Sequence, residues 1–358
     1  MPPIGSYINE IAGLWETGQI TNNGVKLQTL ERELKRYLCA DNVSIFVNGH
    51  TALEIALGTI ANKGEVITSP FTFTSTLLAI IRNGMKPVFC DIKEEDFTLD
   101  PVEADRYITN DTCGILPVHV FGNICDAGAF GTISSEYGIP VIYDAAQAFG
   151  ISVDGLPVSG LGAVSMFSFH ATKVFHTIEG GCLTYSDNKL EEYFSLVRNF
   201  GLSDGVSMVC GTNAKMPETN AAMGLCNLRC IDDYIGTRKE LTEKYDEYLA
   251  GRRGVLLNKI PANVTYNYCY YPIRVVQELY GRSRDELHDY LVKNGVYARK
   301  YYYPLVSDYP IISKTANRAP LPVAEKVSRQ VLVLPLHTNM DLDDVAYICR
   351  LILEFQTS

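Results

Sequence analysis

The segment VIYDAAQAFG, residues 141–150, decides how the first half of the chain should fold. Its apolar run belongs to a predicted strand, Ile139–Tyr143, that ends directly before Asp144. Other short runs rich in apolar and β-branched residues predict further strands: Ser44–Val47, Glu65–Thr68, Pro87–Cys90, Gly114–Val120, Ala163–Phe169 and Gly181–Tyr185. Between several of them lie residues with helical spacing, namely Leu27, Leu30, Leu34 and Leu38, and then Leu53, Ile55, Ala56 and Leu57. Buried strands that alternate with helices predict an α/β fold with a mostly parallel sheet covered on both faces.

The character of the chain changes near Ile231, where the charged sequence DDYIGTRKELTEKYDEYLAGRRG predicts an amphipathic helix with a solvated face. Beyond it we expect two strands, Thr265–Val275 and Ser328–Pro335. A terminal helix is predicted over Asp341–Phe355, and its buried stripe would consist of Val345, Ile348, Ile352 and Phe355. The sequence therefore predicts an α/β major domain, residues 1–235, and a smaller α+β domain, residues 236–358.

Composition excludes several classes of protein. Among 358 residues, 31 Lys and Arg stand against 41 Asp and Glu, so the net charge of −10 argues against general binding to nucleic acid or to anionic membranes. Ten cysteines occur without any C-x-x-C spacing, which favours neither a metal site nor a disulfide framework. There is no signal-peptide pattern and no apolar run of the roughly 20 residues that span a bilayer. These features predict an enzyme of the cytoplasm.

Two charged residues follow predicted strands. Asp144 stands at the carboxyl end of its strand, where it would either cap a helix or hold a proton on a buried ring nitrogen. Lys173 lies in FSFHATKVFHTIEGG, residues 167–181, just after another apolar strand. A lysine in a loop is most often an exposed charge, but a partly desolvated amine loses its proton more easily, and that is the condition for Schiff-base chemistry.

A third segment, FVNGHTALEIAL, places Gly49, His50 and Thr51 at the start of a helix. The free N–H groups and the positive end of such a helix form a cradle for an anion. No G-K-[ST] motif and no dinucleotide fingerprint is present. An aspartate, a lysine and an anion cradle in one α/β domain together suggest pyridoxal 5′-phosphate (PLP) bound through the lysine.

Over nearly its whole length the chain resembles the DegT/DnrJ/EryC1/StrS family of sugar aminotransferases, a branch of the aspartate-aminotransferase fold type (fold type I). The resemblance is carried, in the family's order, by ITNNGVKLQTLE, NGHTALEIAL, SPFTFTSTLLAI, KPVFCDI, LPVHVFGN, VIYDAAQAFG, FSFHATKVFHTIEGG, GTNAKMPETNAAMG and VLVLPLH. It implies that Lys173 forms the Schiff base and then moves protons. It also implies that Asp144 pairs with the pyridine nitrogen, that Gln147 bonds near the ring's phenolic oxygen or the phosphate, and that Phe73 stacks on the ring.

The resemblance further implies how the cofactor phosphate is held. Gly49, His50 and Thr51 match the phosphate cradle, and Ser168 matches a serine that adds a contact. Asn213 matches an asparagine that reaches the phosphate from a neighbouring subunit, which implies a homodimer with shared active sites.

The chain departs from the family pattern at several positions. Many members have Ser or Thr where this chain has His50, so a side-chain phosphate contact there is in doubt. The family's usual Tyr-Arg after the asparagine is replaced by Ala214–Lys215, which keeps the charge but loses the planar fork. His170 lies near the substrate in the family, but the sequence is equally compatible with a packed strand histidine.

One further segment, ARKYYYPLVSDYP, combines basic and aromatic residues. That composition is compatible with surface or interface structure and, less readily in an acidic chain, with nucleic-acid stacking. The resemblance places it near a nucleotide-sugar pocket, where Tyr301 could stack on a sugar and Arg299 could meet a diphosphate. Lys215 is a third candidate for substrate contact.

The implied activity is transfer of an amino group from L-glutamate to a keto-sugar linked to a nucleotide, most often a 4-keto-6-deoxyhexose on dTDP or UDP. The cofactor would pass through its pyridoxamine form, with Lys173, Asp144 and His170 as catalytic residues. Relatives that carry His in place of the lysine remove a sugar hydroxyl instead, which Lys173 argues against. Amination of keto-inositols and a non-catalytic sugar-binding role stay open as alternatives.

Overall fold

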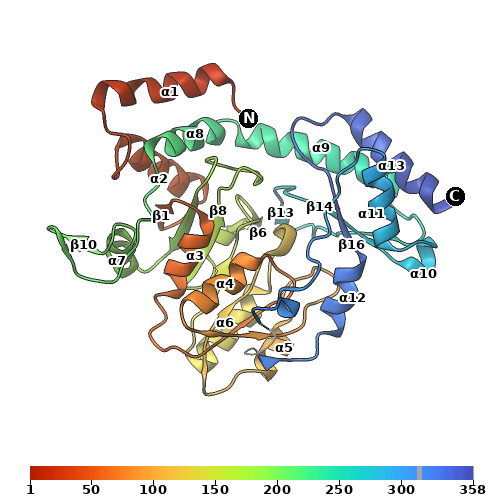
Figure 1. Ribbon diagram of the computed structural model, residues 1–358, viewed down its shortest axis with the longest axis horizontal. Helices are drawn as coiled ribbons and strands as arrows, with labels where there is room; N and C mark the ends of the chain where they lie inside the picture. The colour runs from red at the N-terminus through yellow and green to blue at the C-terminus, as the bar shows by residue number, and fades with distance from the viewer. Residues whose placement is uncertain (313–316, 358) are drawn as a thin grey trace.

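The computed structural model describes residues 1–312 and 317–357 (Figure 1). Two sheets, in the orders β15-β3-β2-β4 and β5-β8-β9-β1, form its central layer. Parallel bridges join Ile115 to Val141 and Val118 to Asp144, so β4 lies next to β5 and the two sheets form one continuous layer. Neighbouring strands from β15 to β8 run parallel, whereas β9 is antiparallel to β8 and β1. The expectation of a mostly parallel sheet is thus confirmed, with β9 as the reversed strand of this layer.

The strands of this layer are β1 (Asn42–Phe46), β2 (Glu65–Thr68), β3 (Lys86–Phe89), β4 (Thr112–Leu116), β5 (Ile142–Asp144), β8 (Val164–Ser168), β9 (Gly181–Tyr185) and β15 (Asn317–Arg318). Successive residues of a strand enter different hydrophobic clusters. Ile45 and Phe167 pack with α2 and α8, while Phe46 and Met166 pack with α3 and α4. Because side chains alternate between the two faces of a strand, both faces of the sheet are buried, as the continuous apolar runs predict.

The helices around this layer are α1 (Ile4–Thr17), α2 (Val25–Tyr37), α3 (Gly49–Leu57), α4 (Thr74–Arg82), α5 (Pro101–Arg106), α6 (Ala127–Tyr137), α7 (Lys189–Val197) and α8 (Glu218–Leu228). The leucine stripe of α2 lies in the core as its spacing predicts, with Leu27, Leu30 and Leu34 at most 1% exposed. Two short 3-10 helices, η1 (Val120–Gly122) and η2 (Val158–Gly160), also lie in this half of the chain.

The C-terminal part packs on the connector helix α9 (Ile231–Leu249). Its antiparallel sheet has the order β12 (Val255–Leu257), β14 (Tyr271–Val275), β16 (Val331–Leu334). The accompanying helices are α10 (Gln277–Tyr280), α11 (Arg284–Lys293), η3 (Val306–Asp308), α12 (Pro322–Gln330) and α13 (Leu342–Thr357). The predicted boundary at 235/236 falls inside α9, and the division into two domains stays a prediction.

Several predicted strands are shorter than expected, among them Gly114–Val120, which ends at Leu116, and Ile139–Tyr143, which begins at Ile142. The same holds for the two strands predicted in the C-terminal part. Thr265 belongs to β13 (Val264–Thr265), which pairs with β6 (Ser152–Val153) in a small sheet completed by β7 (Leu156–Pro157). The following residues leave strand geometry because the side-chain amide of Asn267 donates to the main-chain oxygens of Gln147 and Phe149. The second strand begins at Val331 rather than Ser328, since Ser328 lies in α12.

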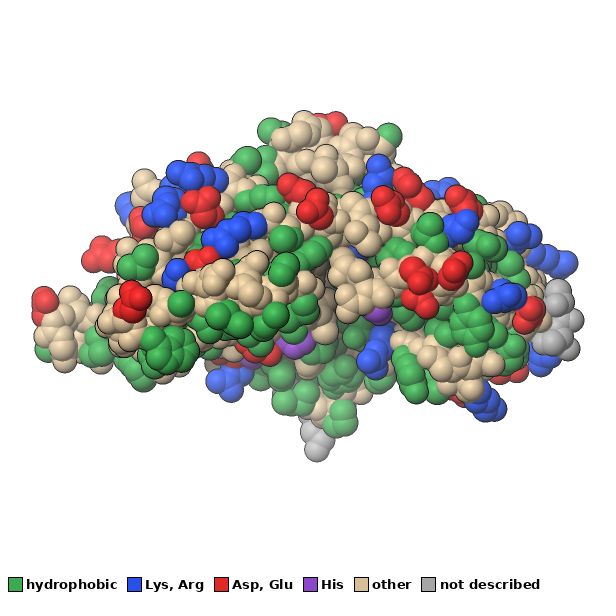
Figure 2. Space-filling model, turned by 90° about the horizontal axis from the view of Figure 1, so that it is seen from above, with side chains coloured by type: hydrophobic (Ala, Val, Ile, Leu, Met, Phe, Trp, Pro, Cys, Tyr) green, Lys and Arg blue, Asp and Glu red, His purple; other side chains and the backbone are tan. Residues whose placement is uncertain are grey.

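A hairpin of β10 (Leu202–Ser203) and β11 (Val206–Ser207) extends from the body next to α7, and α1 lies along the outer side near α8 (Figure 1). Both segments expose large apolar side chains, which are Ile4, Ile8 and Trp15 on α1 and Phe200, Leu202, Val206 and Met208 around the hairpin. In Figure 2, basic and acidic side chains are interspersed on the visible face. Within the described part of the chain, no helix is both long and apolar enough to cross a membrane.

Candidate active site

Asp144 ends β5 and is buried at the carboxyl edge of the sheet. Its Oδ2 accepts a hydrogen bond from Thr76 Oγ1 at 2.8 Å, and its Oδ1 accepts one from the Ala146 N–H at 3.1 Å. Burial raises the pKa of Asp144, while these hydrogen bonds and the charge of Lys173 oppose the rise. The two hydrogen bonds therefore fix the carboxylate in position. Together with the positive charge of Lys173, they compensate part of its negative charge.

Lys173 lies in the turn that follows β8, where its N–H donates to the His170 oxygen at 2.9 Å. Its Nζ stands 5.9 Å from the centre of the Tyr270 ring. Burial lowers the pKa of Lys173, and the charge of Asp144 opposes that shift. The structure thus brings the two residues within electrostatic reach of each other although they are 29 positions apart in the sequence.

The start of α3 forms the anion cradle. The side chain of Asn48 caps the helix by accepting the Thr51 N–H at 2.8 Å. A Cβ atom added to Gly49 would lie 3.0 Å from Ser168 Cβ, so this helix end packs directly against the end of β8. Gly49 and Ser168 therefore meet at one place, where the N–H groups of Gly49 and His50 lack intrahelical partners, while that of Thr51 is taken by the cap.

His50 is held by protein groups on both sides of its ring. Its Nδ1 lies 2.9 Å from Ser75 Oγ, and its Nε2 lies 3.1 Å from the carboxylate of Glu54, which also pairs with Arg82. The ring thus connects α3 to the start of α4. Since both ring nitrogens are engaged, His50 offers the cradle its main-chain N–H rather than its side chain.

Gln147 and Phe73 are both near this edge of the sheet. Gln147 Oε1 accepts the Phe121 N–H at 2.6 Å, and its Nε2 donates to Tyr302 Oη at 2.7 Å. Phe73 precedes α4 and is 60% exposed, so its ring is open to contact a ligand or another chain.

The remaining candidates lie on exposed segments. The side chain of His170 is exposed, with Nδ1 2.9 Å from Thr172 Oγ1 and Nε2 3.5 Å from the Glu179 carboxylate. This excludes the packed strand histidine that the sequence left open. Asn213 is exposed after the hairpin, and Lys215 donates to Asn199 Oδ1 at 2.8 Å.

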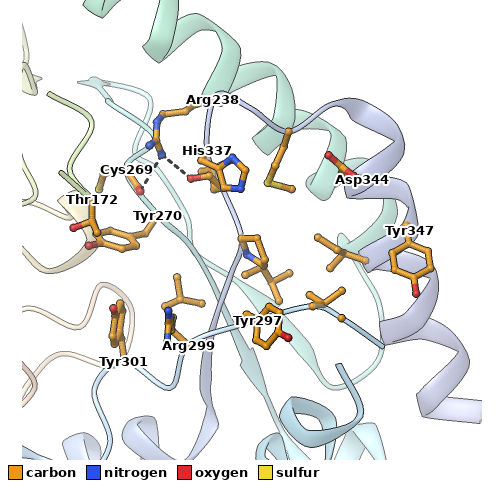
Figure 3. Close-up of a pocket in the computed structure, with 18 of the residues that line it drawn as sticks. Thr172, Arg238, Cys269, Tyr270, Tyr297, Arg299, Tyr301, His337, Asp344 and Tyr347 are labelled. Carbon is orange, nitrogen blue, oxygen red and sulfur yellow. Dashed lines mark hydrogen bonds between the residues drawn. The ribbon is translucent and has the colours of Figure 1, made fainter. Parts of the chain in front are cut away.

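A cavity of about 660 Å³ lies beside Ala171 and Thr172, just before Lys173, and is lined mainly by the C-terminal part of the chain (Figure 3). It is lined by Thr172 and Tyr270 on one side and by Arg299 and Tyr301 on another. Tyr301 stacks on Tyr302, with ring centres 5.2 Å apart. The structure thus joins the basic and aromatic segment around residue 300 to the lysine site.

Several residues at the site were not found from the sequence: Thr76, His119, Arg238, Tyr270 and His337. His119 is buried, and burial lowers the pKa of its ring to about 3. Its main-chain N–H donates to the main-chain oxygen of Asp144 at 3.0 Å. His119 and His337 lie in motifs that carry the family resemblance, which was the available signal. Thr76 lies in SPFTFTSTLLAI, another of these motifs, whereas Arg238 and Tyr270 had no spacing that would single them out.

The strand order with reversed β9, and Lys173 after β8, define a PLP-dependent transferase of fold type I. The chain belongs to the DegT/DnrJ/EryC1/StrS aminotransferase family, whose model matches residues 5–353.

Two relatives are similar over almost their entire lengths. The dTDP-4-amino-4,6-dideoxy-D-glucose transaminase of Shigella dysenteriae is 36% identical over 357 residues, covering 99% of this chain and 97% of the relative. The protein of the same name from Escherichia coli is 34% identical, covering 99% and 96%. Among solved structures, DesI in the presence of its TDP-sugar product superposes with a TM-score of 0.95 at 29% identity, covering 100% of this chain and 91% of DesI.

Proposed function

We propose that this protein is a PLP-dependent aminotransferase that moves an amino group from L-glutamate to a nucleotide-linked keto-sugar. The observation that carries the proposal is the buried Asp144 beside Lys173, with the α3 cradle at the same edge of the sheet. The names of the two similar transaminases favour a dTDP-linked 4-keto-6-deoxyhexose as acceptor.

The residues present fit the cofactor. The start of α3 presents the main-chain N–H groups of Gly49 and His50 beside Ser168, as an approaching phosphate requires. The carboxyl group of Asp144 is buried, and a protonated ring nitrogen beside it would stabilise its ionised form. Lys173 supplies an amine whose pKa is lowered by burial. When bound, the cofactor supplies an electron-withdrawing ring that stabilises negative charge on the carbon next to the transferred nitrogen.

Each residue then has a definite task. Asp144 holds a proton on the ring nitrogen, and Thr76 and Ala146 keep its carboxylate oriented. The neutral Nζ of Lys173 would remove the proton from the donor carbon that carries the nitrogen and, as general acid, deliver it to the carbon on the other side of that nitrogen. The lowered pKa favours the neutral amine that this task needs. Arg299 and Tyr301 line the cavity where the nucleotide-sugar would bind.

The proposal includes a homodimer with shared sites in the cytoplasm. The exposed apolar residues of α1 and of the β10–β11 hairpin offer contact surface, and exposed Asn213 lies just after the hairpin. All ten cysteines are free thiols, which suits a reducing compartment.

The test is amino transfer with purified protein, PLP, L-glutamate and a panel of acceptors. We expect 2-oxoglutarate and an aminated sugar from dTDP-4-keto-6-deoxy-D-glucose, identified by mass spectrometry. Lys173→Arg keeps the charge but cannot serve as the neutral amine, so turnover should fall by about 10²–10⁴-fold or more. Lys239→Arg, on the exposed face of α9, is the matched control. Undiminished turnover in Lys173→Arg would refute the mechanism, and amination of scyllo-inosose alone would refute the acceptor class.

A further inference from the structure

Arg238 is a buried cation in the wall of the active-site cavity. It lies on α9 and is 7% exposed. Its hydrogen bonds all start at Nη1 and end on main-chain oxygens, with Leu336 at 2.9 Å, Cys269 at 3.3 Å and Tyr268 at 3.5 Å. Nε has no acceptor among the residues that the structure describes. Figure 3 shows the guanidinium at the edge of the cavity, with two of these bonds dashed.

No carboxylate of the described residues forms an ion pair with this guanidinium. A charged group removed from water is costly unless it is paired and fully hydrogen-bonded. Main-chain oxygens satisfy one nitrogen of Arg238 and leave the net positive charge uncompensated. An anion in the cavity would supply the missing charge, and it would approach the Nη end of the guanidinium, because Nε itself is enclosed by protein.

The anion would lie close to the reacting amine, because one short segment connects the two cations. Cys269 accepts from Arg238, and the ring of the next residue, Tyr270, is 5.9 Å from Lys173 Nζ. The charges of Lys173 and Arg238 both act on the Cys269 thiol, opposing the burial that raises its pKa to about 12. Lys173 and Arg238 therefore both lie close to the segment Cys269–Tyr270, which lines the cavity.

We infer that Arg238 binds a carboxylate of the amino donor and thereby selects a dicarboxylic amino acid. This inference rests on the proposed function. A carboxylate of glutamate lies one or three carbons from the reacting carbon, whereas the diphosphate of a sugar nucleotide is separated from that carbon by the hexose ring. The buried Arg238 suits the compact donor, and Arg299, which is exposed at the cavity, suits the longer nucleotide.

The experiment separates the two half-reactions of the loaded enzyme by stopped-flow absorbance. The variants are Arg238→Met and Arg238→Lys. The second is included in case Arg238→Met does not fold, because a lysine can still donate to the main-chain oxygens. A lost charge-assisted hydrogen bond should raise the glutamate concentration for half-maximal rate by about 10–100-fold. The half-reaction with the keto-sugar should change less than about 3-fold, because the diphosphate lies elsewhere.

Binding of glutarate, measured by calorimetry, gives a readout independent of turnover and should weaken by the same factor. Lys239→Met, which removes a neighbouring exposed charge from α9, should leave all three measurements unchanged. Equal losses in both half-reactions, a loss confined to the keto-sugar half, or unaltered glutamate dependence would each overturn the inference. If the wild-type enzyme does not respond to glutamate at all, the proposed function fails first, and this outcome is distinguishable from the others.

Discussion

At the scale of single residues, the state of Asp144 is set by two opposing effects. Burial favours the neutral acid, whereas the hydrogen bond from Thr76 favours the carboxylate. Thr76 receives support in turn, because its hydroxyl lies 2.8 Å from that of Thr72. A short hydroxyl chain, from Thr72 before α4 to Thr76 within it, therefore supports the ionised form of Asp144.

Replacing Thr76 by Val removes the bond to Asp144 and should raise the pKa of that carboxyl further. Asp144 then becomes protonated at higher pH than before, so the acid limb of the pH–rate profile should move upward by about one to two pH units. The profile of kcat against pH measures this shift. Thr132→Val, on the exposed surface of α6, is the control. An unmoved acid limb in Thr76→Val would show that Thr76 does not tune Asp144.

At the scale of elements, α2 depends on a residue distant in the sequence. The helix begins at Val25, and its N-cap residue, Gly24, has no side chain that could cap it. The buried carboxylate of Glu218, 194 residues later, accepts the N–H of Gly24 at 3.0 Å, and it also accepts that of Lys26 at 2.7 Å. A Cβ on Gly24 would lie 2.6 Å from this carboxylate, so the glycine is required for the close approach.

Glu218→Gln should therefore destabilise the fold while leaving the catalytic residues in place. The amide has one acceptor oxygen and presents a donor to an N–H group, so the free energy of unfolding should fall by about 1.5–3 kcal/mol. Urea unfolding followed by circular dichroism measures the change. Glu16→Gln, exposed on α1, should have no effect. Equal stability of the two variants would contradict the capping role.

At the scale of the whole molecule, the proposed sharing of active sites between two subunits can be tested by mixing inactive variants. A homodimer of Lys173→Arg subunits and a homodimer of Asn213→Ala subunits should each have impaired activity. In a mixed dimer, one of the two sites combines the native Lys173 of one subunit with the native Asn213 of the other. Random mixing at equal amounts should restore about a quarter of the wild-type activity. Activity is measured after subunit exchange, with mass photometry to establish the dimer. Absence of any recovery would argue that each chain builds its own complete site.

Much of the sheet and the principal candidates followed from the sequence, since local patterns carry them. Glu65–Thr68 and Gly181–Tyr185 have the bounds that their apolar runs predict, because a strand buried on both faces must be continuously apolar. Asp144 and Lys173 stood out because each follows such a strand, and parallel strands bring their carboxyl ends to one edge.

Tertiary structure alone decided which partner each polar group has. Three examples depend on segments distant in the sequence: the contact of His50 Nδ1 with Ser75, the use of Gln147 by Phe121 and Tyr302, and the pairing of Arg238 with main-chain oxygens. A hydrogen bond depends on distances of a few tenths of an ångström between groups that the fold brings together. Periodicity along one segment contains no information about such distances, so the sequence determined where the chemistry lies and the fold decided how each group is charged and held.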